Sequence, residues 1–148
     1  MVRKYSRKSA FTLVEILIVV IILGILAAIV IPQFTSASTE ARENSVRSQL
    51  QTLRSQIELY KLQHGDALPD LVTNWNPLLN TTSFGGNSYG PYLQAAPSNP
   101  LNNNSNVVNG TNAAAASAAC GFVYDYAAGA GTGRIWATGT DGTTIFVE

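Results

Sequence analysis

One apolar stretch, residues 11–31, restricts the fold of this chain more than any other feature. Thr12 and Glu15 are its only polar side chains. At the rise of an α-helix the stretch reaches roughly 32 Å, which matches the hydrocarbon thickness of a bilayer. A chain of 148 residues has no core deep enough to enclose such a helix on every side. We therefore expect residues 11–31 to cross a lipid bilayer.

Four basic side chains between positions 3 and 8 precede this stretch, so the amino terminus should stay cytoplasmic and the rest be exported. Two ordinary interpretations exist for such a segment. One is a secretory signal peptide cleaved near Ala37, and the other is a plain membrane anchor whose Glu15 reaches the headgroups. A signal peptide, however, has an apolar core of about 7–15 residues without an internal carboxylate. Neither interpretation explains why Ala10, Phe11 and Glu15 occur together.

The segment Lys8–Glu15, with the apolar stretch and Pro32 behind it, resembles the amino terminus of the type IV pilin superfamily, which includes the pseudopilins of type II secretion. The resemblance implies that a prepilin peptidase cleaves between Ala10 and Phe11 and methylates the new amine of Phe11. Glu15 would then be the fifth residue of the mature chain, where the family's carboxylate meets the terminal amine of a neighbouring subunit. The family usually has glycine before the cleavage point, and this chain has Ala10.

The helix is expected to continue through residues 32–64. Pro32 removes one backbone donor and should kink the helix without ending it. Apolar residues spaced alternately four and three apart predict a single stripe along one face, and Gly65 supplies a stop signal. The closing segment, residues 60–69, resembles the matching stretch of the major pseudopilins of type II secretion. The stripe consists of Val46, Leu50, Leu53, Ile57 and Tyr60.

The remaining residues, 65–148, are expected to form a small globular part. Its first portion reads as irregular, and residues 102–119, rich in Asn and then Ala, read as a mobile surface loop with one helical turn in residues 113–119. Alternating apolar residues further on predict three short antiparallel strands, which need a partner to bury one face. The predicted strands are residues 121–126, 134–138 and 143–147.

Together these patterns predict an α+β, pilin-like fold, in which one long amino-terminal helix packs on a small three-stranded antiparallel sheet. The first half of the helix spans the membrane, and its striped second half covers the sheet. The predicted organisation is a basic leader (1–10), a membrane and assembly helix (11–31), its amphipathic continuation (32–64) and the globular part (65–148).

The charge and the polar residues exclude several classes of function. The chain has nine basic and nine acidic side chains, and removal of the leader leaves five basic against nine acidic, so a basic nucleic-acid surface is not expected. Cys120 is the only cysteine and reads as a buried structural thiol. His64 is the only histidine and reads as a residue that satisfies the end of the helix. No residue grouping indicates an enzyme.

The resemblance also implies a calcium site, because major pseudopilins carry one in their carboxy-terminal loops, built from carboxylates and carbonyls. This chain offers only Asp125, Asp141 and Glu148 there, whereas calcium prefers six to eight oxygen ligands. Asp141, next to Gly142, reads more simply as a turn residue. We therefore expect no cofactor; the alternative is a calcium site around Asp141 that backbone carbonyls complete.

The resemblance implies a structural subunit of a type II secretion pseudopilus. Such a subunit sits in the bacterial inner membrane with its carboxy-terminal part in the periplasm, and then polymerises into a periplasmic filament that drives protein export. Its partners would be copies of itself, minor pseudopilins, the prepilin peptidase, the inner-membrane secretion platform and the bilayer. Two alternatives remain open: a type IV major pilin that forms surface fibres, and a membrane-tethered binding domain that does not polymerise.

Overall fold

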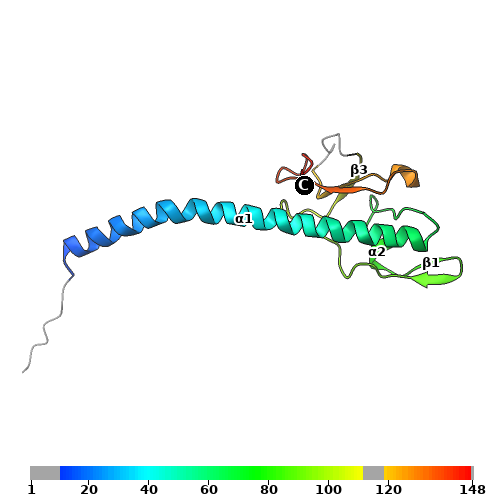
Figure 1. Ribbon diagram of the computed structural model, residues 1–148, viewed down its shortest axis with the longest axis horizontal. Helices are drawn as coiled ribbons and strands as arrows, with labels where there is room; N and C mark the ends of the chain where they lie inside the picture. Colours follow the sequence, from blue (N-terminus) through cyan, green and yellow to red (C-terminus); the bar gives the residue numbers. More distant parts are fainter. Residues whose placement is uncertain (1–10, 112–118, 148) are drawn as a thin grey trace, which may run out of the picture. The chain divides into compact units, whose positions relative to one another are not determined.

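The computed structural model describes residues 11–111 and 119–147. Its main element is the helix α1, Leu13–Gln63, which confirms the long helix expected from the sequence to within two residues at its start and one at its end (Figure 1). The chain divides into two compact units, Met1–Glu40 and Ala41–Glu148. The boundary between the two units lies within α1. The predicted leader lies outside the described residues.

The described part of the first unit is the apolar portion of α1. Its large hydrophobic side chains between positions 11 and 31 are 41–82% exposed. Within the described residues, α1 is the helix that is long and apolar enough to cross a membrane. Pro32 lies inside α1, and the hydroxyls of Thr35 and Ser36 donate to the carbonyls of Ile31 and Pro32 at 3.1 Å. A Ser or Thr hydroxyl that donates to the carbonyl four residues earlier often bends a helix. The kink at Pro32 itself stays a prediction.

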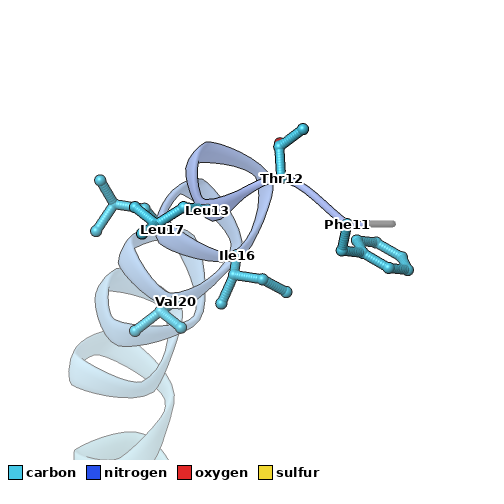
Figure 2. Close-up of a pocket in the computed structure, with 6 residues that line it drawn as sticks. All are labelled: Phe11, Thr12, Leu13, Ile16, Leu17 and Val20. Carbon is cyan, nitrogen blue, oxygen red and sulfur yellow. The ribbon is translucent and has the colours of Figure 1, made fainter. Parts of the chain in front are cut away.

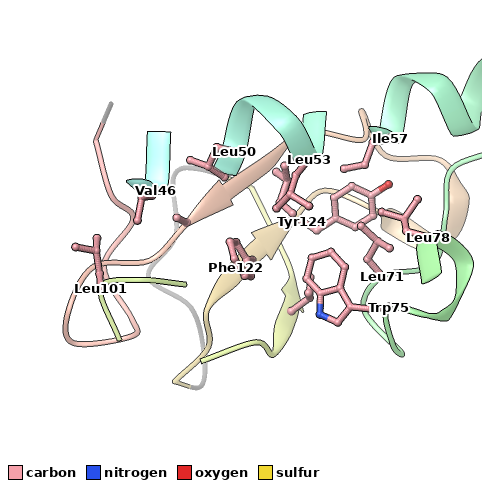
Figure 3. Close-up of a cluster of buried hydrophobic side chains, with 13 residues drawn as sticks. Val46, Leu50, Leu53, Ile57, Leu71, Trp75, Leu78, Leu101, Phe122 and Tyr124 are labelled. Atoms are coloured by element: carbon pink, nitrogen blue, oxygen red, sulfur yellow. The ribbon is translucent and has the colours of Figure 1, made fainter. Parts of the chain in front are cut away.

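The second unit is organised around the predicted stripe of α1. Four of its five residues are no more than 1% exposed, and the fifth, Tyr60, is partly buried against the same core. The stripe faces Phe122 and Tyr124 of the sheet, while Trp75 packs edge-on against the ring of Phe122 at a centroid distance of 5.7 Å (Figure 3). Burying each of the four aliphatic stripe side chains contributes about 1.5–3 kcal/mol to the free energy of folding. The four fully buried stripe residues are Val46, Leu50, Leu53 and Ile57.

A three-stranded sheet supplies the other side of this core. Its strands are β3, Val107–Asn109, β4, Phe122–Tyr124, and β5, Ile135–Ala137, in the order β3-β4-β5. Strand β4 pairs antiparallel with β5, as predicted, but parallel with β3. The α+β class and the helix-on-sheet arrangement are therefore confirmed, whereas the sheet is mixed and not antiparallel throughout.

The prediction of a third strand at residues 143–147 is wrong. This segment makes one isolated antiparallel bridge, between Thr138 and Ile145. The physical reason lies in the preceding turn, where the carboxylate of Asp141 accepts the backbone N–H groups of Thr143 and Thr144 at 3.0 and 2.9 Å. Those two donors are then lost to a strand ladder.

The stretch that the sequence left irregular contains short elements. They are the helix α2, Asn76–Leu79, and a hairpin of β1, Thr82–Phe84, with β2, Asn87–Tyr89. Gly85 and Gly86 join the two strands with φ values of 59° and 84°, which a two-residue hairpin turn requires. One turn of 3-10 helix, η1, follows at Ala127–Gly129.

Residues 102–111 contain regular structure and side-chain hydrogen bonds, which the expectation of a loop did not include; the mobility of this region stays a prediction. Strand β3 begins within it, and side-chain amides of Asn102 and Asn104 bond to backbone groups before the strand. The predicted helical turn in residues 113–119 falls almost entirely outside the described residues.

Candidate assembly site at the start of α1

Thr12 and Glu15 cap the start of α1 reciprocally. The backbone N–H and the hydroxyl of Thr12 both donate to Oε2 of Glu15 at 2.8 Å. In return, the backbone N–H of Glu15 donates to the Thr12 hydroxyl oxygen at 3.2 Å. The Thr12 carbonyl accepts the first bond of the helix, from the N–H of Ile16. This arrangement is a capping box, which satisfies backbone donors that the first helical turn leaves without partners.

Thr12 was not predicted from the sequence as a partner of Glu15. The signal was present, because Thr-x-x-Glu directly before an apolar run is the pattern of a capping box. The partner predicted for the carboxylate was the terminal amine of a neighbouring subunit. The contact of Glu15 with the amine of Phe11 in another subunit stays a prediction, as do cleavage after Ala10 and methylation of Phe11. Ala10 lies outside the described residues.

A shallow, mostly apolar depression surrounds this end of the helix, and Figure 2 shows its lining residues. Phe11 is 82% exposed at its edge, and Thr12 is its polar member. Ile16 and Val20 project one turn apart along the helix. An apolar surface beside a single carboxylate offers both packing area and one charged contact to a partner helix. The other lining residues are Leu13 and Leu17.

His64, the other polar residue singled out in the sequence, has a structural environment. Its ring stacks on the ring of Tyr60 with centroids 3.9 Å apart and planes 4° from parallel. Its Nδ1 lies 2.9 Å from the Tyr60 carbonyl, and its Nε2 lies 2.9 Å from the Thr82 hydroxyl. A carbonyl only accepts, so Nδ1 carries the proton and Thr82 donates to Nε2. The expectation that His64 helps to satisfy the helix end is confirmed.

Cys120 is fully buried, and burial raises the pKa of its thiol. The prediction of a buried structural thiol is therefore confirmed. A thiol in that state is a poor nucleophile, since the thiolate is the reactive form.

The carboxylates considered for calcium bind neighbouring threonines. The hydroxyl and backbone N–H of Thr132 donate to Asp125 at 2.6 and 3.1 Å and lower the pKa of that carboxyl. Asp141 is held in the same way, chiefly by the hydroxyl and N–H of Thr144, and its pKa falls further. The assignment of Asp141 as a turn residue is confirmed. Within the described residues, no three His, Cys, Asp or Glu side chains gather to hold a metal, and Glu148 lies outside them.

Comparison with known proteins agrees with the motif at the amino terminus. Residues 5–31 match the model of the prokaryotic N-terminal methylation motif. The type II secretion system core protein G of Pseudomonas aeruginosa is 40% identical over 58 residues, which cover 39% of this chain and 41% of that protein. No solved structure matches the chain significantly.

Two further relatives align over most of their length. The core protein G of Aeromonas hydrophila is 32% identical over 101 residues, covering 66% of this chain and 70% of that protein. The protein of the same name from Vibrio cholerae is 30% identical over 108 residues, covering 68% of this chain and 70% of that protein. The resemblance to the major pseudopilins is therefore confirmed, and the chain belongs to the family of type II secretion system core protein G.

Proposed function

We propose that this chain is the structural subunit of a type II secretion pseudopilus. The prepilin peptidase cleaves it between Ala10 and Phe11 and methylates the amine of Phe11, and the subunit then polymerises from the inner membrane. The match of residues 5–31 to the methylation motif is the observation that supports this proposal most directly. The relatives named core protein G favour a pseudopilin over a surface pilin or a monomeric tethered domain. In this role the chain is a structural protein and not an enzyme.

The apolar part of α1 has two successive environments in this proposal. In the bilayer its exposed side chains contact lipid, with the amino terminus on the cytoplasmic side and the globular unit in the periplasm. In the filament the same side chains contact sister helices. Lipid tails are as apolar as leucine, so transfer from one environment to the other changes the apolar burial little. Polar contacts must therefore determine where an incoming subunit docks.

Glu15 is the residue placed to make such a contact. Its Oε2 atom accepts both hydrogen bonds from Thr12, which fixes the orientation of the carboxylate. A carboxylate has acceptor positions on both oxygens, so a third donor can bind beside the cap. The methylated amine of Phe11 in a neighbouring subunit is a cation, and a charge-assisted bond in surroundings of low dielectric is strong. Copies of the chain and minor pseudopilins are the partners that carry such an amine.

The variant Glu15→Gln tests this contact. Glutamine retains an oxygen that accepts from Thr12, so the helix cap and membrane insertion should persist, while the charge is lost. The expected result is a correctly inserted and processed subunit whose incorporation into filaments falls at least about tenfold, the loss of roughly one strong ion pair. Sheared filaments and secreted enzyme are measured in a strain that carries only the variant. Glu40→Gln, an exposed position on the same helix, is the matched control.

Normal filaments from Glu15→Gln would contradict the pairing. Processing is measured separately by mass spectrometry of the mature amino terminus. A mass that begins at Met1, or near Ala37, would refute the prepilin assignment itself. Long surface fibres in the parent strain, together with unimpaired secretion in a strain that lacks the chain, would instead support the type IV pilin.

A further inference from the structure

The side-chain amide of Asn99 lies in the interior of the second unit and binds three segments together. Asn99 is fully buried. Its Nδ2 group donates to the carbonyls of Gly121 and Thr138 at 2.8 and 2.7 Å. Its Oδ1 atom accepts the backbone N–H of Leu101 at 2.9 Å. One amide thereby links the loop before β3 to the residue before β4 and to the residue after β5.

Asn102, three residues further along the same loop, makes a similar set of contacts. Its Nδ2 group lies 3.1 Å from the carbonyl of Cys120, 3.0 Å from the carbonyl of Gly139 and 2.9 Å from the hydroxyl of Thr138. Its Oδ1 atom accepts the backbone N–H of Asn104 at 3.0 Å. Oxygens from two distant segments therefore converge on a neutral donor group.

Converging carbonyls are also among the ligands that calcium takes, and the resemblance to the major pseudopilins implies a calcium site in the carboxy-terminal loops. Within the described residues, the carboxylates do not fit such a site. Strand β4 pairs with β5 from Phe122 opposite Ala137 to Tyr124 opposite Ile135. Asp125 follows the last row of this ladder, and Asp141 lies beyond the first row.

The two carboxylates are thus at opposite ends of the ladder and cannot share one ion, given a rise of about 3.3 Å per residue. Two carbonyls close to Asp141 in the sequence already accept hydrogen bonds. The Gly139 carbonyl accepts from Gly142 and Asn102, and the Gly142 carbonyl accepts from Cys120. At the Gly139 carbonyl, which accepts two hydrogen bonds, a cation would have to displace a donor while losing part of its own hydration shell.

We propose that Asn99 and Asn102 replace the metal as the cross-link of the carboxy-terminal loops, so that the globular unit is stable without divalent cations. A neutral amide offers two N–H donors to converging carbonyls and carries no charge that must be desolvated. The oxygen of the same amide accepts a backbone N–H two residues later and so closes a local turn. Each amide therefore uses both its donor and its acceptor. A polar network whose members are all satisfied rigidifies the segments that it joins.

The first test uses the full chain in detergent micelles and follows thermal unfolding of the globular unit by fluorescence of Trp75 and Trp136. Unfolding midpoints are compared in excess EDTA, in millimolar calcium and in millimolar magnesium. The three midpoints should agree within about 1 °C, because a ligand that does not bind the native state cannot stabilise it. A rise of more than about 3 °C that calcium produces and magnesium does not would overturn the proposal.

The second test changes the amide itself, in EDTA. Asn102→Asp keeps the shape of the side chain but turns a donor group into an anion that faces two carbonyls. The midpoint should fall by roughly 5–15 °C, since partly buried hydrogen bonds are lost and repulsion replaces them. Asn106→Asp is the matched control, because it makes the same charge change in the same loop at an exposed position. It should shift the midpoint by less than about 2 °C.

Equal shifts in the two variants would refute the role of Asn102. If Asn102→Asp does not fold, Asn102→Ala replaces it, because it removes the donors without adding charge. A midpoint for Asn102→Ala within about 2 °C of the unchanged chain would overturn the proposal. The comparison of EDTA with calcium needs no variant and decides the metal question by itself.

Discussion

Oε2 of Glu15 accepts two hydrogen bonds from Thr12, one from its backbone N–H and one from its hydroxyl, each 2.8 Å long. The charged residue of the apolar segment therefore has a fixed position before any second subunit is present. A side chain with a preset orientation loses less conformational entropy when a partner binds. The contribution of Thr12 to docking can therefore be tested by substitution, as that of Glu15 can.

We predict that Thr12→Ala reduces filament assembly and that Thr12→Ser does not. Alanine removes the hydroxyl that both donates to Glu15 and accepts from it, at a cost of about 1 kcal/mol to the cap. Serine retains the hydroxyl. Assembly is measured as the sheared filament fraction, and insertion by membrane fractionation should be unchanged in both variants. Equal assembly by the two variants would show that the cap has no part in docking.

The buried stripe of α1 should dominate the stability of the second unit. Leu53→Ala removes a side chain that is 1% exposed, and it should lower the free energy of unfolding by about 2–5 kcal/mol. Leu62→Ala, at a residue that is 77% exposed on the same helix, should change it by less than about 0.5 kcal/mol. Denaturant titration of the full chain in detergent, followed by tryptophan fluorescence, measures both. A loss at Leu62 as large as that at Leu53 would contradict the observed core.

The turn at Asp141 predicts how stability depends on pH. Hydrogen bonds from Thr144 and Thr143 lower the pKa of this carboxyl in the folded chain. A group with a lowered folded pKa stabilises above its unfolded pKa, about 4, and loses that contribution as the pH falls through the folded value. The unfolding midpoint should therefore decrease below about pH 4. The variant Asp141→Asn retains an acceptor for the turn. As the pH falls, its unfolding midpoint should decrease less steeply than that of the control Asp66→Asn.

Cys120 should react slowly with thiol reagents in the folded chain. Burial both shields its sulfur and raises the pKa of the thiol, so little thiolate is present near neutral pH. Labelling with a maleimide at pH 7 should be at least about a hundredfold slower than in denaturant, where the thiol regains its ordinary pKa and full access. Rapid labelling of the native chain would show that the segment before β4 opens readily.

The sequence predicted the features that depend on long, regular patterns. The stripe from Val46 to Tyr60 repeats over four turns, so its helical period identifies both the helix and its buried face. The apolar stretch before it is equally unambiguous in length. Phe11, Glu15 and the leader predict the candidate site because they occur together at fixed spacing. The methylation motif found over residues 5–31 supports this interpretation.

The features that were missed depend on partners far away in the chain. Strand β3 has three residues, too few to show an alternating period. It pairs in parallel with β4, and the loop before it is hydrogen-bonded to the residues that precede β4. That loop is held by Asn99 and Asn102, whose amides bond to residues up to 39 positions away. Asparagine is common in mobile loops and in ordered polar networks alike, so composition cannot distinguish them. Thr12 was the exception, since its signal was local and was overlooked.

The exposed side chains between positions 11 and 31 have a consequence for the life of the subunit in the cell. A surface so rich in leucine, isoleucine and valine has no compatible state in water, where it would drive aggregation. A freely diffusing pool of subunits in water is therefore disfavoured. If the chain assembles as proposed, each subunit has to pass directly from the bilayer into the filament, without a dissolved intermediate.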